Sequence, residues 1–183
     1  MGSDTDNTYD WDDTYADGSE WEKKIYERIV KVFTNAKRLE GKNPSGDIDT
    51  CVGFRLEVKG ETGSALSGNI LIEWGRVYHD NPNNFYEVRR VQSGLTNTTS
   101  RYYIHCDEAN GIYVTRVDDL CEFIEKYAHD REYCELQYDV KMKQRNSYTF
   151  FDNVLIRERH YKAMSKYCHY DDFNEEFIKA NIV

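Results

Sequence analysis

The chain has 183 residues, of which 39% are hydrophobic and 14% aromatic, and this suits one folded domain with a sizeable core. No apolar run approaches the roughly 20 residues of a membrane-spanning helix, and no signal-peptide segment follows the start. The sequence therefore argues against a membrane protein, and we expect a soluble, cytoplasmic one.

The formal net charge of −9 arises almost wholly in the first 22 residues. Eight acidic and no basic residues lie there, whereas the other 25 acidic and 24 basic residues nearly balance. We predict an acidic, disordered or loosely attached arm over residues 1–19 and a single domain over residues 20–183. Because the body of the chain is close to neutral, the net charge does not exclude a nucleic-acid partner.

After the arm, the spacing of apolar residues predicts an amphipathic helix that ends near Leu39, with Ser19 as its N-cap. Its apolar stripe consists of Ile25, Ile29, Val32, Phe33 and Ala36. A segment containing Pro44 and Gly46 ends the helix before the next element.

Residues 47–60 predict a β-hairpin that turns at Thr50–Gly53. Strand side chains alternate faces, so Glu57 and Lys59 point the same way, and the pairing brings Asp47 opposite Glu57. Magnesium-dependent hydrolysis of phosphodiesters needs such a set: carboxylate ligands for the cation and an ammonium group beside the water and phosphate. The alternative is an ordinary ion pair between Glu57 and Lys59 on a half-exposed strand.

Asp49 shares a face with Asp47, from which it is two residues away. A tighter turn would make Asp49 the metal ligand. Asp also caps turns frequently. The sequence leaves both roles open.

The rest of the chain predicts further strands and helices. Strands are expected over residues 47–51, 54–60, 69–75, 85–91, 101–106, 112–115 and 148–157, and helices over 95–100, 117–128 and 158–167. Residues 75–84 are expected to form a polar connection, and Ser93 to cap the short helix after it. The five cysteines are scattered singly, which argues against a zinc ribbon and for free thiols.

Three segments together resemble the PD-(D/E)XK nuclease superfamily, in particular phage-type and resolvase-like members. The first is Asp47 with Glu57-Val58-Lys59. The second is Thr62-Gly63 followed, after the insertion Ser64–Ser67, by Gly68-Asn69-Ile70-Leu71-Ile72-Glu73. The third is Ser93-Gly94-Leu95-Thr96-Asn97-Thr98-Thr99. The resemblance covers roughly residues 20–128 and leaves 129–183 as a C-terminal extension. It implies a restriction-endonuclease-like α/β fold, with a mixed central β-sheet flanked by helices and an α-β-β-β-α-β core.

The resemblance also implies a metal-dependent endonuclease that hydrolyses DNA phosphodiester bonds with Mg²⁺, for which Mn²⁺ can substitute. Asp47 and Glu57 would hold the metal, Lys59 would position a water, and Glu73 would reach a second cation or orient the site. The supporting candidates are Glu20 and Glu27 on the first helix and Ser93 and Gly94 in a loop below the site. The candidate DNA contacts are Lys141, Lys143, Arg145, Arg157 and Arg159.

The style of the resemblance suggests a phage or mobile-element protein that acts in the host cytoplasm, and it leaves a homodimer open. Two alternatives remain at this stage. A nuclease-like domain without activity would serve as a DNA-binding or protein-interaction (host-takeover) module, and in a small structural protein the E-x-K tripeptide would be accidental. Convergence of Asp47, Glu57 and Lys59 in one site would favour the enzyme over both.

Overall fold

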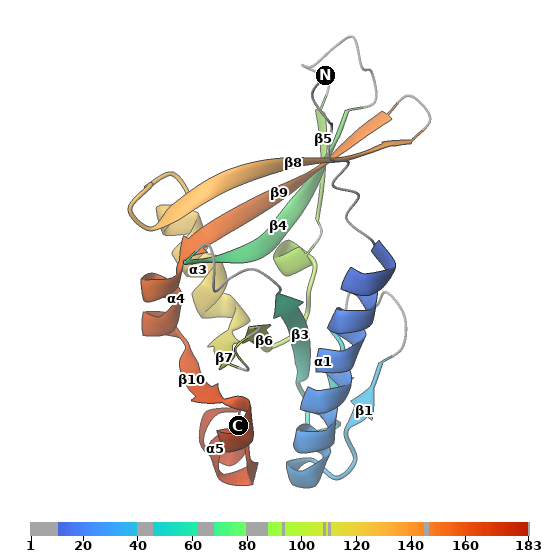
Figure 1. Cartoon of the computed structure of the whole chain (residues 1–183), viewed down its shortest axis with the longest axis vertical. Helices are drawn as coiled ribbons and strands as arrows, with labels where there is room; N and C mark the ends of the chain where they lie inside the picture. The colour runs from blue at the N-terminus through green and yellow to red at the C-terminus, as the bar shows by residue number, and fades with distance from the viewer. Residues whose placement is uncertain are drawn as a thin grey trace, which may run out of the picture.

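The computed structural model describes residues 11–39, 46–61, 68–79, 88–92, 94–107, 109, 111–144 and 147–182 (Figure 1). These residues form two β-sheets and the helices around them, which confirms the predicted α/β class with a mixed central sheet. Ser93, Arg145 and the insertion over residues 64–67 lie outside the described residues.

The central sheet has six strands in the order β1-β2-β3-β6-β7-β10. Strands β3 and β6 are parallel and the other neighbours antiparallel, so the sheet is mixed. The strands are β1 (Lys37–Arg38), β2 (Ile48–Asp49), β3 (Arg55–Glu61), β6 (Tyr102–Asp107), β7 (Gly111–Arg116) and β10 (Lys166–His169). The hairpin of β2 with β3 is as predicted, and β6 and β7 lie at two of the predicted strands, 101–106 and 112–115.

Helices α1 (Trp11–Val32) and α5 (Glu175–Asn181) pack together on one face of this sheet. The predicted apolar stripe of α1 supplies Ile25 and Ile29, both fully buried, against β3. Burial of each such side chain contributes about 1.5–3 kcal/mol. This packing fixes α1 beside β3, the strand that carries Glu57 and Lys59 (Figure 1).

A second, antiparallel sheet of four strands packs with α3 (Val117–Tyr127) in a separate hydrophobic cluster, to which β6 and β7 contribute Tyr103 and Tyr113. Its order is β5-β4-β9-β8. The strands are β4 (Asn69–His79), β5 (Val88–Gln92), β8 (Cys134–Gln144) and β9 (Ser147–Arg157).

Residues 69–75 lie in a strand, as predicted, but this strand is not in the central sheet beside β3, where the resemblance would place it. This segment is the start of β4 in the second sheet, and β4 continues to His79, where a polar connection was expected. Strand β9 is the antiparallel neighbour of β4 and supplies its apolar partners: Ile156 pairs with Ile70, and Val154 pairs with Ile72. The strand that pairs with β3 on this side of the central sheet is β6. The predicted C-terminal extension thus contributes β8 and β9 to a shared sheet.

Several element ends also differ from prediction. Helix α1 begins at Trp11, so Ser19 lies inside the helix and is not its N-cap, and the helix ends at Val32 before β1. Helix α4 (Glu158–Met164) is shorter than expected because β10 follows it and pairs with β7. A 3₁₀ turn, η1 (Gly94–Thr96), replaces the predicted helix over 95–100. None of the helices in the described part of the chain is long and apolar enough to span a bilayer.

Candidate active site

Asp47 lies where β2 diverges from β3, directly after Gly46. Its backbone N–H donates to the Leu56 carbonyl at 2.9 Å, which continues the hairpin by one residue. Its carboxylate Oδ2 accepts the Val58 N–H at 2.7 Å. The side chain therefore takes over a hydrogen bond at the edge of β3 that the departing β2 no longer makes, and this holds the Asp47 carboxylate beside β3.

Glu57 and Lys59 share one face of β3, and their side chains are in contact. The Glu57 Oε1 atom lies 2.8 Å from Lys59 Nζ, and Oε2 accepts the Thr98 hydroxyl at 3.1 Å. The Glu57 side chain is only 12% exposed, whereas that of Lys59 is 44% exposed. Glu57 is thus fixed from two sides, while the ammonium group remains accessible to a ligand.

The charges of these residues act on one another. Burial, followed by the negative charge of Glu57, raises the pKa of Asp47 from 3.8 to about 6. Burial alone would lower the pKa of Lys59, but the charges of Glu57, Asp47 and Glu73 outweigh it and raise that pKa. The site therefore holds carboxylates in excess over one permanently charged ammonium group.

The structure brings Asp47, Glu57 and Lys59 together in one site, with Glu73 close enough to influence Lys59. Glu73 lies at the β-bulge of β4, next to η1. Gly94 makes this contact with φ +52°, and a Cβ atom there would overlap the Glu73 carbonyl oxygen. Gly94 thus shapes the loop at the site through a close backbone approach.

On α1, the residue whose charge acts on this site is Glu22, which sequence reasoning missed. Its charge contributes to the raised pKa of Asp47, and its carboxylate lies 3.6 Å from Arg38 Nη2. Of the two predicted candidates, Glu20 forms an exposed ion pair with Lys24 and Glu27 is exposed. A signal was present, because Glu22 lies three and seven residues before Ile25 and Ile29, on the stripe that faces the sheet.

Asp49 lies at the end of β2 and is engaged in the hairpin turn. Its Oδ1 accepts the Cys51 N–H at 2.8 Å, and its Oδ2 lies 3.2 Å from Arg55 Nε. The Cys51 N–H, against a smaller effect of burial, lowers the pKa of Asp49. These contacts give Asp49 the turn-capping role that the sequence left open.

The predicted DNA contacts fall in two places. Lys141 and Lys143 lie on β8, towards the end of the β8–β9 hairpin. Arg157 ends β9, and Arg159 follows in the first turn of α4. The last two line a common pocket.

Two carboxylates suit a cation that retains water. Among the described residues, no three His, Cys, Asp or Glu side chains gather closely enough to enclose a metal ion. Mg²⁺ commonly binds through only one or two carboxylates, completed by water and substrate phosphate. The Asp47–Glu57 pair fits that mode, because the negative charge of Glu57 raises the pKa of Asp47 and a bound cation would offset that charge.

We expect Asp47→Asn to stabilise the metal-free protein near neutral pH. Because the folded-state pKa of Asp47 is raised to about 6, its stabilising contribution is complete below pH 3.8 and is lost as the pH rises through 6. Asparagine can still accept the Val58 N–H but does not ionise. Melting curves in EDTA should therefore show equal Tm values for the variant and the wild type at low pH, and a higher Tm for the variant above pH 6. Each kcal/mol of stability that the variant gains should raise its Tm by about 2–4 °C. A difference independent of pH would contradict this.

No protein-family model matches the sequence, and no curated protein matches it. Among solved structures, the chain is similar to a bacterial homing endonuclease, I-Ssp6803I, with a TM-score of 0.45 and 19% sequence identity over 60% of this chain and 73% of that one.

Proposed function

We propose that this protein is a metal-dependent nuclease that hydrolyses DNA phosphodiester bonds at the site formed by Asp47, Glu57 and Lys59. The observation that carries the proposal is the convergence of these side chains where β2 leaves β3, with Glu57 held by Lys59 and Thr98 and the Asp47 carboxylate beside them. The resemblance of these residues and of the segments after them to PD-(D/E)XK nucleases supports the same function. An accidental surface ion pair does not account for the half-buried Asp47 carboxylate beside it.

In the proposed site, Asp47 and Glu57 hold Mg²⁺, and Mn²⁺ can take its place. A bound Mg²⁺ would polarise the scissile phosphate and lower the pKa of a coordinated water. Thr98 holds Glu57 Oε2 while Lys59 contacts Oε1, so the orientation of the Glu57 carboxylate is fixed. The carboxylates need the cation because they otherwise repel each other.

Lys59 acts as a charged donor. Its raised pKa keeps the ammonium group protonated at neutral pH, so it is not the base that takes a proton from water. It can donate hydrogen bonds to the attacking water and to a non-bridging phosphate oxygen, where negative charge grows in the transition state. The water gives up a proton to solvent and its oxygen bonds to phosphorus; the bond from phosphorus to the leaving oxygen breaks, and that oxygen takes up a proton from solvent. The superfamily resemblance implies a 5′-phosphate product.

The test is an assay of purified protein on duplex, branched and single-stranded DNA and on RNA, with Mg²⁺, Mn²⁺ or EDTA. We expect cleavage of DNA with either cation and none in EDTA. A protein that cuts no nucleic acid with either cation is not the enzyme that we propose.

We expect Glu57→Gln to abolish cleavage and to remove the stabilisation that Mg²⁺ gives the wild-type protein. The amide keeps the Thr98 hydrogen bond but contributes no charge to the cation. The stabilisation by Mg²⁺ is measured by differential scanning fluorimetry at Mg²⁺ concentrations that rise in 10-fold steps. A ligand that binds only the folded state raises the Tm as its concentration rises. Glu175→Gln, which removes the carboxylate of an exposed ion pair on α5, is the matched control and should respond to Mg²⁺ as wild type does.

A further inference from the structure

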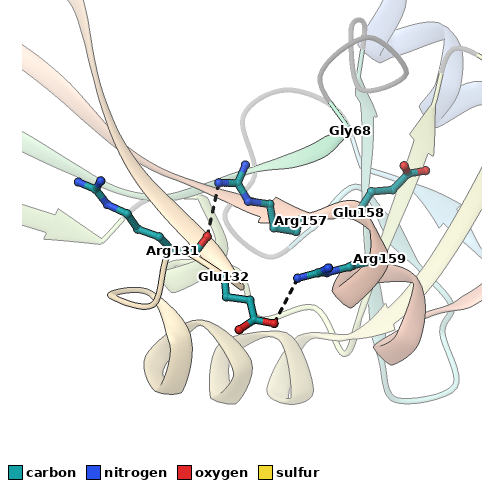
Figure 2. Close-up of a pocket in the computed structure, with 6 residues that line it drawn as sticks. All are labelled: Gly68, Arg131, Glu132, Arg157, Glu158 and Arg159. Carbon is teal, nitrogen blue, oxygen red and sulfur yellow. Dashed lines mark hydrogen bonds and ion pairs between the residues drawn. The ribbon is translucent and has the colours of Figure 1, made fainter.

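A pocket of about 470 Å³ lies apart from the candidate active site, between the start of β4, the segment before β8 and the junction of β9 with α4 (Figure 2). Three arginines line it, Arg131, Arg157 and Arg159, together with Gly68 and two glutamates. Stacking of Tyr133 on His160, with ring centroids 4.3 Å apart, joins the segments that carry Arg131 and Arg159. The positive groups thus come from two segments that this stacking holds together.

The three arginines differ in how firmly they are held. Arg157 is fixed, because Nη1 donates to Asn69 Oδ1 at 2.9 Å and Nη2 to the Arg131 carbonyl at 3.4 Å (Figure 2). The Arg131 guanidinium has no partner among the side chains that the structure describes. Arg159 pairs with Glu132 at 3.3 Å and donates from Nε to His160 Nε2 at 3.1 Å, but both contacts are exposed and therefore weak. Arg131 and Arg159 can therefore turn to an anion at little cost.

The two lining glutamates do not cancel this charge. Glu158 forms an ion pair with Lys162 at 2.6 Å and points away from the arginines in Figure 2. Glu132 neutralises at most one arginine. Glu135 lies 3.6 Å from Arg157 and is half-exposed. The pocket keeps a positive charge that a phosphate can neutralise, and the planar guanidinium groups suit its oxygens.

Strand β4 connects this pocket to the candidate active site. Alternation along the strand places Asn69, Leu71 and Glu73 on the same face. Asn69 binds Arg157 at the pocket, Glu73 acts on Lys59 at the site, and Leu71 between them is 37% exposed. The four residue steps from Asn69 to Glu73 span about 13 Å along the strand. A nucleic-acid strand that leaves Lys59 along this face reaches the arginines within a few nucleotides.

We propose that the pocket of Arg131, Arg157 and Arg159 binds one backbone phosphate of the DNA substrate, a few nucleotides from the scissile bond. This inference rests on the proposed nuclease function. The contact positions the strand over the catalytic residues without reading its sequence, since phosphate contacts carry no base information.

The experiment compares DNA binding by the full chain in EDTA, where nothing is cut, with cleavage in Mg²⁺. The test variant is Arg131→Gln with Arg159→Gln, which spares the structural Arg157. The control is Lys31→Gln with Lys179→Gln, which removes two positive charges from exposed positions on α1 and α5. We expect the Kd of the arginine variant to rise about 10-fold, with a fall of about one in the salt slope, because one phosphate contact is lost. The lysine control should stay within about twofold of wild type.

A second measurement identifies the phosphate. Duplexes with one uncharged methylphosphonate linkage at successive positions should weaken wild-type binding at a single position a few nucleotides from the cleavage site. The arginine variant should be insensitive at that position, because the partners of the phosphate are already gone.

Equal losses in the two double variants, or no loss in either, would overturn the pocket while leaving cleavage by the wild type, and hence the proposed function, intact. If all proteins bind DNA as expected but the wild type cuts nothing in Mg²⁺ or Mn²⁺, the nuclease function fails and the phosphate pocket is supported as a binding site alone. Absence of wild-type binding and cleavage overturns both.

Discussion

Replacement of Lys59 by alanine should abolish most cleavage, lowering its rate by at least about 10²-fold, which is typical of losing one donor to developing charge. Lys59 is the cation in contact with Glu57, and its side chain is accessible enough to reach a phosphate. DNA binding should stay within a few-fold of wild type, since one charge among many contacts is lost. Cleavage of supercoiled DNA in Mg²⁺, beside a gel-shift assay in EDTA, measures both effects.

The matched control for this variant is Lys179→Ala. Lys179 also pairs with a glutamate, Glu175 at 3.2 Å, and is 59% exposed on α5. It should cut DNA at the wild-type rate. If Lys59→Ala cuts as fast as this control, Lys59 has no role in the reaction, and any nuclease activity arises from another site.

Gly94→Ala should destabilise the fold by about 2–4 kcal/mol. Its φ of +52° disfavours any L side chain, and the added Cβ would overlap the Glu73 carbonyl oxygen, so β4 and η1 would have to move apart. For a domain of this size, the Tm should fall by roughly 5–15 °C. Thermal melting followed by circular dichroism measures this change.

Gly68→Ala separates the two causes. Gly68 has a similar φ of +63°, but a Cβ atom there would meet nothing within 4 Å. It should cost only the backbone strain, about 1 kcal/mol. Equal Tm losses in the two variants would show that the contact with Glu73 yields without cost, contrary to our expectation.

Much of the arrangement of the candidate site could be predicted because it is local in the chain. The hairpin turn at Thr50–Gly53 sets the register, and the period of two along a strand places Glu57 and Lys59 on one face. Asp47 follows from the same register, one residue beyond the Ile48–Leu56 pair. The apolar stripe of α1 and the helix α3 were also predictable, since burial against one sheet imposes a helical period.

Residues brought together from distant segments could not be predicted in this way. The sequence alone does not say which strand lies beside β3, because β4 and β6 are both apolar enough, and the choice depends on the partners that β9 offers to β4. The same non-local packing brings Thr98 to Glu57.

The sequence by itself determined the chemistry of the candidate site: an aspartate, a glutamate and a lysine, placed by a turn and a strand repeat that act over about a dozen residues. Only the tertiary structure decided what surrounds it, including the contact of Gly94 with Glu73 and the pocket that gathers Arg131, Arg157 and Arg159. The physical reason is the distance along the chain over which each effect acts. Alternation and turn geometry are properties of neighbouring residues, whereas the pairing of distant segments follows from the apolar surface that the whole chain can bury at once.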